Sequence, residues 1–445
     1  MASFLTNADL NNKQDKNNRA SKFWFPLDNA AKIFPAILTE ELTSVFRLSA
    51  ILKHPVKIQS FLKAVAKADK RFPYYKVRLK EGFFWYYLEH IPVRIPVEVD
   101  DKKVCRGFRQ NSLLLRILVI ENKVSVEFSH ILTDGGGAFE FLKTLLVQYF
   151  IELGREIPAT FKYLSSKQEI LEEEYEDSYQ RYFKEDVPPM VGRSKAFHLP
   201  WTLNSRPRFH HQNIIIPLEQ VKDVASKKGV SVNDFLVAAY LFILQEIYEE
   251  NGMAGKQKNN KPIRVQVPVN LRKIFPSKTM RNFSLFVMPE IDLRLGHHTF
   301  DEMLKSVYHQ IKLETDPKLI NKNIARNVGS ERKIYVKSIP LFLKSLILRT
   351  KYYSLGSNQY SGVMTNLGKA KFPPQAEELI DHFVFTPPPP NKLVKVSCGI
   401  IGFKDKLVLS FSNITDSMQL EEKFIRFFND YAINAVFESK QKSEL

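Results

Sequence analysis

Apolar residues recur along this chain with two periods, and together they predict alternating strands and helices. Continuous or alternating apolar runs over 44–52, 112–120 and 123–128 predict strands, the last two joined by Glu121 and Asn122. Apolar residues at helical spacing over 56–70 and 139–150 predict helices, the first preceded by Pro55. Residues 77–88 continue as extended, aromatic-rich structure, which is either core or the wall of a pocket. The first part of the chain is therefore expected to form an α/β unit.

The same alternation resumes further along the chain. Strands are predicted over 213–216, 263–272, 282–287, 361–365, 394–403 and 407–413, and helices over 217–228, 231–247, 300–314, 341–353 and 418–437. The acid-rich segment 169–184 has helical spacing and predicts a surface helix with a solvated face.

Composition shifts divide the chain into four parts. Residues 1–20 are polar and rich in Asn, which predicts a flexible tail. Residues 186–212 contain Pro188, Pro189, Pro200 and Pro207 without sustained periodicity, and predict a crossover linker. Two α/β halves, 21–185 and 213–445, are expected to flank it.

Composition excludes several classes of protein. Hydrophobic residues make up 44% of the 445 positions, enough for a large core. The net charge of +17 is spread over scattered Lys and Arg without a nucleic-acid-binding signature, so we expect no nucleic-acid partner. Neither an apolar leader nor a run of eighteen apolar residues occurs, and we expect a soluble, cytoplasmic protein. Cys105 and Cys398 are expected to be free, buried thiols.

One short segment carries the clearest chemistry. His130 follows the strand 123–128, and Asp134 precedes Gly135, Gly136 and Gly137, which lead into the helix 139–150. A His at a strand end can direct its ring into a cleft from a fixed backbone. Three successive glycines are costly to order, so they predict either positive φ or a very close backbone approach. A lone core histidine would account for His130 but not for this context.

The His-x-x-x-Asp-Gly pattern resembles the active-site motif of the chloramphenicol acetyltransferase-like superfamily, which includes condensation domains, plant BAHD acyltransferases and alcohol acetyltransferases. Val267–Arg272 and Thr365–Gly368 resemble two further family segments. Arg281–Ser284 departs from the pattern, because Arg281 stands where many members have Gly. The plant Asp-Phe-Gly-Trp-Gly element and the tandem His of condensation domains are missing, so the alcohol acetyltransferase-like branch is the most similar. The resemblance implies a two-domain α/β fold, with mixed sheets flanked by helices.

The resemblance also implies roles for particular residues. His130 would be the general base that removes the proton of an attacking hydroxyl. Thr365 or Asn366 would donate a hydrogen bond to the developing oxyanion. Asp134 would point away from His130 and pair with Arg272, and Gly135 would let the loop turn into the helix. No residue is assigned to cofactor binding.

The expected activity is transfer of an acyl group, typically acetyl, from a coenzyme A thioester to a small or apolar alcohol. Acyl-coenzyme A would be a co-substrate, and no permanent cofactor or metal is expected, because the ten histidines show no metal-ligand spacing. No nucleophile motif occurs, which favours direct transfer in a ternary complex. Two alternatives remain open: transfer from a phosphopantetheine carrier protein to an amine or hydroxyl, and a non-catalytic relative of the fold.

The segment 341–353 has two interpretations. Leu341, Leu343, Leu346 and Leu348 cover more than half of a helix that also carries Lys344, Arg349 and Lys351. Such a helix either packs between the two halves or lies at the mouth of the channel and contacts a membrane peripherally.

Overall fold

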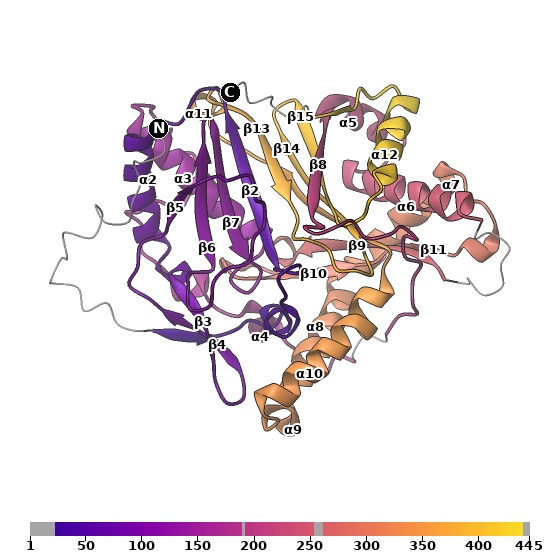
Figure 1. Ribbon diagram of the computed structural model, residues 1–445, viewed down its shortest axis with the longest axis horizontal. Helices are drawn as coiled ribbons and strands as arrows, with labels where there is room; N and C mark the ends of the chain where they lie inside the picture. The colour runs from indigo at the N-terminus through magenta and orange to yellow at the C-terminus, as the bar shows by residue number, and fades with distance from the viewer. Residues whose placement is uncertain (1–22, 189–191, 253–260, 439–445) are drawn as a thin grey trace.

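The first sheet carries the segment with His130. The computed structural model describes residues 23–188, 192–252 and 261–438 (Figure 1); the predicted tail 1–20 lies outside them. Five strands pair in the order β13-β2-β7-β6-β5. Their bounds are Val97–Val99 (β5), Leu115–Ile120 (β6), Lys123–Ser129 (β7), Val45–Leu52 (β2) and Ile380–Thr386 (β13). The hairpin β6–β7 confirms the two predicted strands joined at Glu121.

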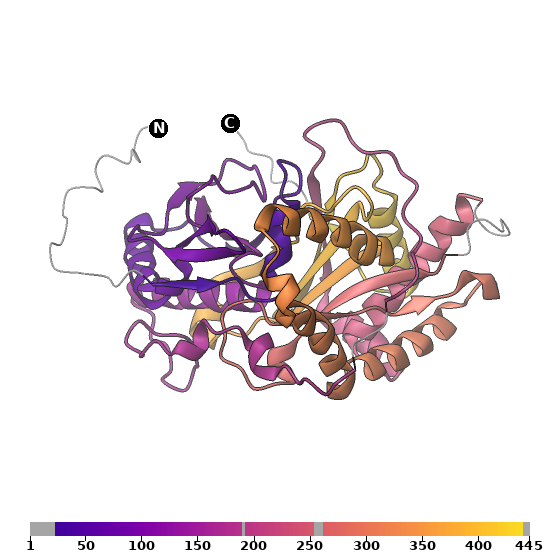
Figure 2. The same cartoon turned by 90° about the horizontal axis from the view of Figure 1, so that it is seen from below.

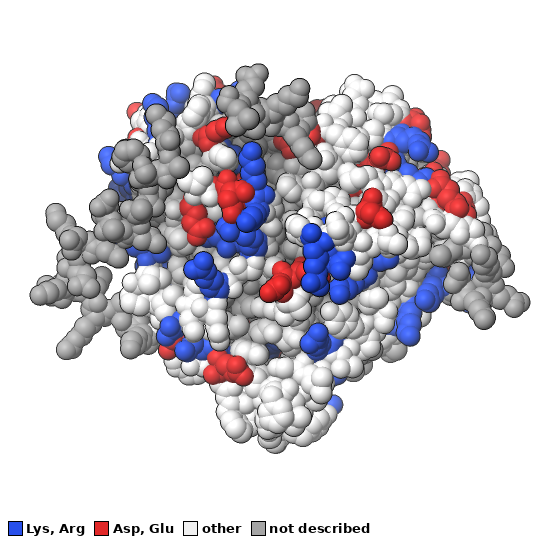
Figure 3. Space-filling model, in the orientation of Figure 1, with Lys and Arg blue, Asp and Glu red and all other residues white. Residues whose placement is uncertain are grey.

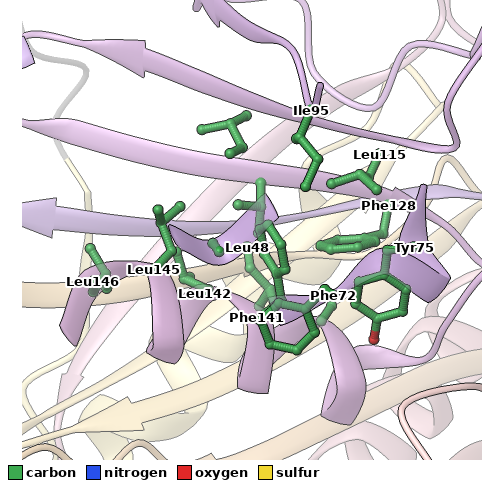
Figure 4. Packing of buried hydrophobic residues seen from close by; sticks show 14 of the residues in the cluster. Leu48, Phe72, Tyr75, Ile95, Leu115, Phe128, Phe141, Leu142, Leu145 and Leu146 are labelled. Atoms are coloured by element: carbon green, nitrogen blue, oxygen red, sulfur yellow. The ribbon is translucent and has the colours of Figure 1, made fainter. Parts of the chain in front are cut away.

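Helices α2 (Ile58–Arg71) and α3 (Gly135–Glu152) pack together against this sheet, as Figure 1 shows. Their inward faces and the sheet form the core of the first half. Phe72, Phe128 and Phe141 meet there at ring-centroid distances of 5.1 to 5.4 Å in the Phe72–Phe141 and Phe128–Phe141 pairs (Figure 4). This burial fixes the end of β7, and with it the backbone of His130.

The second sheet lies in the other half. Its main path is β10-β9-β12-β14-β15-β8-β16, and β11 also pairs with β9. The bounds are His210–Pro217 (β8), Ile263–Asn270 (β9), Ser284–Val287 (β10), Glu290–Ile291 (β11), Gly362–Lys369 (β12), Val396–Phe403 (β14), Lys406–Asn413 (β15) and Val436–Phe437 (β16). Four helices belong to this half: α5 (Leu218–Lys227), α6 (Val232–Glu250), α7 (Phe300–Glu314) and α12 (Gln419–Asp430). A second core lies between this sheet and its helices, and α6 is buried along almost its whole length.

A small sheet and six short or peripheral helices complete the described structure. The sheet has the order β1-β4-β3, with bounds Trp24–Pro26, Tyr86–His90 and Val77–Glu81. The helices are α1 (Phe34–Ile37), α4 (Ser178–Tyr182), α8 (Pro317–Arg332), α9 (Ile334–Lys337), α10 (Leu341–Lys351) and α11 (Pro374–Glu377). Figure 2 shows α10 passing beside α1, and the two helices are in contact.

Strand β13 links the two halves. It belongs to the first sheet through antiparallel pairing with β2, although it comes late in the chain, and it also contacts β14 and β15. The approach is close: a Cβ at Gly399 of β14 would lie 2.3 Å from the carbonyl oxygen of Phe385. The predicted division at residues 186–212 stays a prediction, but the first sheet is completed by residues from beyond it.

The predicted surface helix over 169–184 is wrong. The segment contains a 3-10 turn at Glu172–Glu174 and only the short helix α4. Glu174 is buried, and its carboxylate accepts hydrogen bonds from Arg71 at 2.7 and 2.8 Å and from the Tyr74 hydroxyl at 2.8 Å. The acidic run therefore does not lie on one solvated helix face, because Glu174 pairs with a buried arginine while Glu169 and Glu172 are exposed.

Most other predicted elements are present within two or three residues of their expected ends, but the predicted helix over 418–437 is too long: α12 ends at Asp430, and the chain continues to the strand β16. Helix α8 and strand β13 were not predicted, because α8 is polar over most of its surface and β13 is flanked by Pro and charged residues. Cys105 and Cys398 are free and buried, as expected. Within the described ranges no single helix is long and apolar enough to cross a membrane; α5 and α6 pass that test only together, across a bend of 87°.

Candidate active site

A large cavity lies between the two halves. Its volume is about 1480 Å³, and His130 is among its lining residues. The first half contributes Phe34 and Phe139, and the second half contributes Gln266 and Tyr360. The cavity is therefore where groups carried by both sheets meet.

The backbone of His130 is held from both sides. Its N–H donates to the carbonyl oxygen of Ser44 at 2.9 Å, which continues the pairing of β7 with β2. Its carbonyl oxygen accepts from the Asn282 side-chain amide at 2.9 Å. The second half thus fixes the position of a residue that comes from the first.

The imidazole of His130 lies between two phenylalanine rings. Its centroid is 5.4 Å from that of Phe34, in a stacked arrangement, and 4.5 Å from that of Phe46. Burial lowers the pKa of His130 to about 4, while the Asp134 carboxylate, the Asn282 side chain and the Thr133 backbone act in the opposite direction. The ring is therefore neutral at neutral pH and can accept a proton.

Asp134 caps helix α3 and pairs with Arg272. Its Oδ1 accepts from the N–H of Gly137 at 3.0 Å, and its Oδ2 accepts from the Arg272 guanidinium at 2.9 Å and from the N–H of Phe283 at 2.8 Å. The predicted Asp134–Arg272 contact is confirmed. Burial alone would raise the pKa of Asp134, but Arg272 and these hydrogen bonds hold it below its usual value.

Arg272 also binds the backbone of the segment before β10. It donates through Nε to the carbonyl oxygen of Thr279 at 2.8 Å and through Nη2 to that of Arg281. One guanidinium therefore connects the end of β9, the start of α3 and the chain that leads to Asn282. This geometry supports a structural role for Asp134 and Arg272, since the Asp134 carboxylate accepts from Arg272 and two backbone N–H groups and not from the ring of His130.

The three glycines form the first turn of α3, and none has a positive φ. A Cβ at Gly137 would lie 2.2 Å from the carbonyl oxygen of Met280 and 2.3 Å from Oγ1 of Thr133. Of the two reasons predicted for this run, close backbone approach is the one found. At Gly135 the nearest atom would be a methyl of Leu367, at 2.7 Å, which brings β12 against the same turn.

Thr365 and Asn366 lie on β12 and line the cavity that holds His130. The amide nitrogen of Asn366 donates to Asn233 at 3.3 Å, and its carbonyl oxygen accepts from the N–H of Gly368 at 2.8 Å. Asn366 thus has neighbours that hold its side chain. The oxyanion role of either residue stays a prediction.

Sequence reasoning missed the importance of Asn282 and Asp28. Besides the His130 carbonyl, the Asn282 amide binds both carboxylate oxygens of Asp28, at 3.0 and 3.3 Å. Asp28 is fully buried; burial raises its pKa to about 6, although the nearby Arg281 lowers it. Asn282 lies within the segment Arg281–Ser284 that the sequence singled out, although no role was assigned to it; Asp28 lies 254 residues away and carries no local signal.

Arg281 explains the departure from the glycine pattern. It is buried, donates to the carbonyl oxygens of Pro26 and Tyr175, and its Nε lies 3.5 Å from Asp28. A long side chain at this position therefore joins the segment before β10 to β1, Asp28 and Tyr175 instead of leaving space.

Metal ligation finds no support in the described ranges, where no three His, Cys, Asp or Glu side chains are grouped to hold an ion. Basic side chains that line the cavity are instead candidates for holding an anionic co-substrate. Among them are Lys143, Arg193, Arg326, Lys351, Lys369 and Lys371.

Comparison with known proteins gives matches at the level of structure. No protein-family profile matches the chain. No curated protein sequence matches it either. Among solved structures, Fusarium graminearum TRI101 complexed with coenzyme A and deoxynivalenol has a TM-score of 0.58 at 11% identity, over 93% of this chain and 99% of that one.

Two further structures are similar over their whole length. The trichothecene 15-O-acetyltransferase TRI3 of Fusarium sporotrichioides has a TM-score of 0.58 at 9% identity, covering 94% of this chain and 96% of its own. The epimerization domain of the third module of tyrocidine synthetase B has a TM-score of 0.55 at 9% identity, covering 92% and 95%. At such identities the likeness concerns the fold.

Proposed function

We propose that this chain, which has the two-domain fold of the chloramphenicol acetyltransferase-like superfamily, transfers an acyl group from a coenzyme A thioester to an alcohol hydroxyl. The observation that carries the proposal is the imidazole of His130, neutral and directed at a cavity shared by both halves. Acetyl is the acyl group that we favour, because TRI3 is an acetyltransferase and has the same fold.

In this reaction the alcohol oxygen attacks the thioester carbonyl while His130 takes its proton. The carbon–oxygen bond forms first and gives a tetrahedral oxyanion; the carbon–sulfur bond then breaks, and the proton passes from His130 to the departing thiolate. A neutral imidazole suits this task, and general base catalysis contributes roughly 10²–10⁴ in rate. Negative charge develops on the carbonyl oxygen, and the Thr365 hydroxyl or the Asn366 amide is our candidate donor.

The charge of the cavity supports an anionic donor. Lys369 and Lys371 are exposed at the end of β12, just past its irregularity near Gly368, and both line the cavity together with Lys143. Ammonium groups at the rim attract phosphates and raise the local concentration of an anionic co-substrate. TRI101, which was crystallised with coenzyme A, has the same fold.

The test is release of free thiol from acetyl-CoA by the purified chain, measured with a panel of short and long alcohols. We expect turnover with at least one alcohol, and loss of that turnover in His130→Ala with an unchanged melting transition. His211→Ala is a matched control, because His211 lies on β8 outside the cavity lining and burial likewise lowers its pKa to about 4. Full activity of His130→Ala would refute the general-base role.

A second candidate function is transfer from a phosphopantetheine carrier protein. It is favoured by the epimerization domain and by the synthetase FmoA3, which matches over 94% of this chain with a TM-score of 0.55. The same assay with an acyl-loaded carrier protein separates the two donors. Turnover with the carrier but not with acetyl-CoA would select this alternative, and inactivity with both would favour a non-catalytic relative.

A further inference from the structure

Eight large apolar side chains are exposed at one end of the molecule, and we call this group the apolar tip. It comprises Phe83 and Phe84 of the β3–β4 turn, Ile334 and Tyr335 of α9, and Phe342, Leu343, Leu346 and Ile347 of α10. Figure 1 shows that these elements lie together at the bottom of the molecule, and Figure 3 shows that this end carries few charged side chains on the visible face. The tip protrudes from the molecule and does not form a groove.

Helix α10 has its polar and apolar positions reversed relative to an ordinary surface helix. Leu346 is 65% exposed and Phe342 71%, whereas Lys344 is only 3% exposed. A soluble helix gains from burying the leucines and exposing the lysine. The predicted packing between the two halves is therefore absent on this face of α10.

The buried lysine joins the turn to the helix. Its Nζ donates to the carbonyl oxygen of Phe84 at 3.0 Å and lies 3.5 Å from the centroid of the Trp85 ring. The N–H of Leu341 donates to the carbonyl oxygen of Phe83 at 2.9 Å. These contacts fix the two phenylalanines beside the exposed face of α10, so the tip is a preformed surface and not a set of independent side chains.

The charge of the segment that contains α9 and α10 is of one sign. From Arg332 to Ala376 the sequence contains eight Lys or Arg residues and no Asp or Glu. Lys333, Lys337, Arg349 and Lys351 are exposed on or next to α9 and α10. Apolar side chains that protrude between cations are the pattern of a surface that inserts into the headgroup region of an anionic bilayer.

The tip also reaches the cavity. Ile347 is both exposed and part of the cavity lining, and Val336, Ile339 and Leu348 line the cavity beside it. From these observations we propose that the apolar tip docks on a bilayer with anionic lipids, so that the cavity faces the bilayer surface. This inference does not require the proposed function, because binding to lipid is measurable without turnover.

The test is sedimentation of the full chain with vesicles of phosphatidylcholine alone or mixed with phosphatidylglycerol. The wild-type protein should pellet with the mixed vesicles. Phe342→Asp combined with Leu346→Asp should lower the bound fraction by at least about tenfold, since it removes apolar contact and adds repulsion. Leu295→Asp with Leu313→Asp is the matched control: these leucines are 78% and 64% exposed but lie outside the tip. The control should bind as the wild type does.

Several results would overturn the proposal. They are failure of the wild type to bind mixed vesicles, unchanged binding of the tip variant, and an equal loss in the control. A tip variant that turns a dimer into a monomer in light scattering would assign the face to a second copy of the chain. If the double variant did not melt cooperatively, Ile334→Asp on α9, at 81% exposure, would provide the same comparison.

Discussion

At the scale of single residues, the site depends on a histidine kept neutral by its surroundings. The rings of Phe34 and Phe46 lie against the His130 ring, and within the described part of the chain no carboxylate forms an ion pair with it. Asp134 could have been such a partner, but its carboxylate is taken up by Arg272 and two backbone N–H groups. The arrangement favours the form of His130 that accepts protons.

The pH dependence of the reaction follows from this environment. The folded-state pKa of His130 is about 4, below the ordinary 6.5, so the active, neutral base persists until the pH falls through about 4. We expect the acidic limb of kcat/KM near pH 4, measured with a neutral alcohol over a range in which the protein stays folded. A limb near 6.5 would mean that the ring is solvated and would contradict the structure.

The free energy of unfolding should also fall as the pH is lowered, for the same reason. Because folding lowers the pKa of His130, the unfolded chain takes up a proton first as the pH drops from 6.5 to about 4, and the wild type loses stability across that window. His130→Gln, which has no such proton, should lose less over the same window in urea unfolding. Parallel curves for the two proteins would contradict this linkage.

Asp134 and Arg272 should behave differently from His130. The pair is almost completely buried, so removal of one partner leaves an unpaired charge and costs about 3–5 kcal/mol. Asp134→Ala and Arg272→Ala should each lower stability and activity, and the double variant should lose much less than the sum. Urea unfolding of all four proteins gives the coupling, and strictly additive losses would show that the contact contributes nothing.

At the scale of elements, the strand β7, the loop 130–134 and helix α3 together position His130. The strand fixes the backbone of His130, the carboxylate of Asp134 caps the helix, and the glycines allow the first turn to approach the chain at Met280. Tyr75 and Thr133 hydroxyls donate to the same Met280 carbonyl oxygen, so the contact is shared by three elements.

Gly137→Ala tests this approach. Alanine normally stabilises a helix by roughly 0.5–1 kcal/mol relative to glycine, but here its Cβ would overlap backbone at 2.2 Å. We expect loss of both stability and activity. Gly329→Ala in α8 is the matched control, because its Cβ would meet only the Phe183 ring at 3.6 Å, and it should be neutral or stabilising. The measurement is thermal melting of both variants. A Gly137→Ala variant more stable than the wild type would disprove the close approach of Gly137 to the Met280 carbonyl.

At the scale of the whole molecule, the site exists only where the halves meet. His130 is held by Asn282, and Asp134 by Arg272, so each group from the first half has its partner in the second. Strand β13 adds a second reason for this dependence. It comes from residues 380–386 of the second half, and its pairing with β2 completes the first sheet.

The first half should therefore not fold by itself. A fragment of residues 1–212 lacks β13 and leaves β2, with buried residues such as Leu48 and Ala50, as an open edge. We expect this fragment to aggregate or to melt without cooperativity, and co-expression with residues 213–445 to restore a soluble complex. Circular dichroism and gel filtration provide the measurement, and a sharp melt of the isolated fragment would contradict the expectation.

Local pattern determined more of this protein than its low similarity to known sequences suggests. The β6–β7 hairpin, helix α3 and the His130–Asp134 loop between them are contiguous, so the spacing of apolar residues was enough to predict them. The Asp134–Arg272 contact required the resemblance as well, because nothing in either segment by itself points to the other.

Contacts between buried residues that lie far apart in the sequence were decided only by the tertiary structure. It places Glu174 against Arg71, Asp28 behind Asn282, and β13 in the first sheet, and each of these pairs is separated by more than 100 residues. It also turns α10 so that Lys344 faces inward while Leu343 and Leu346 face outward. A helical pattern specifies which residues share a face, but the direction of that face is set by whatever packs against it.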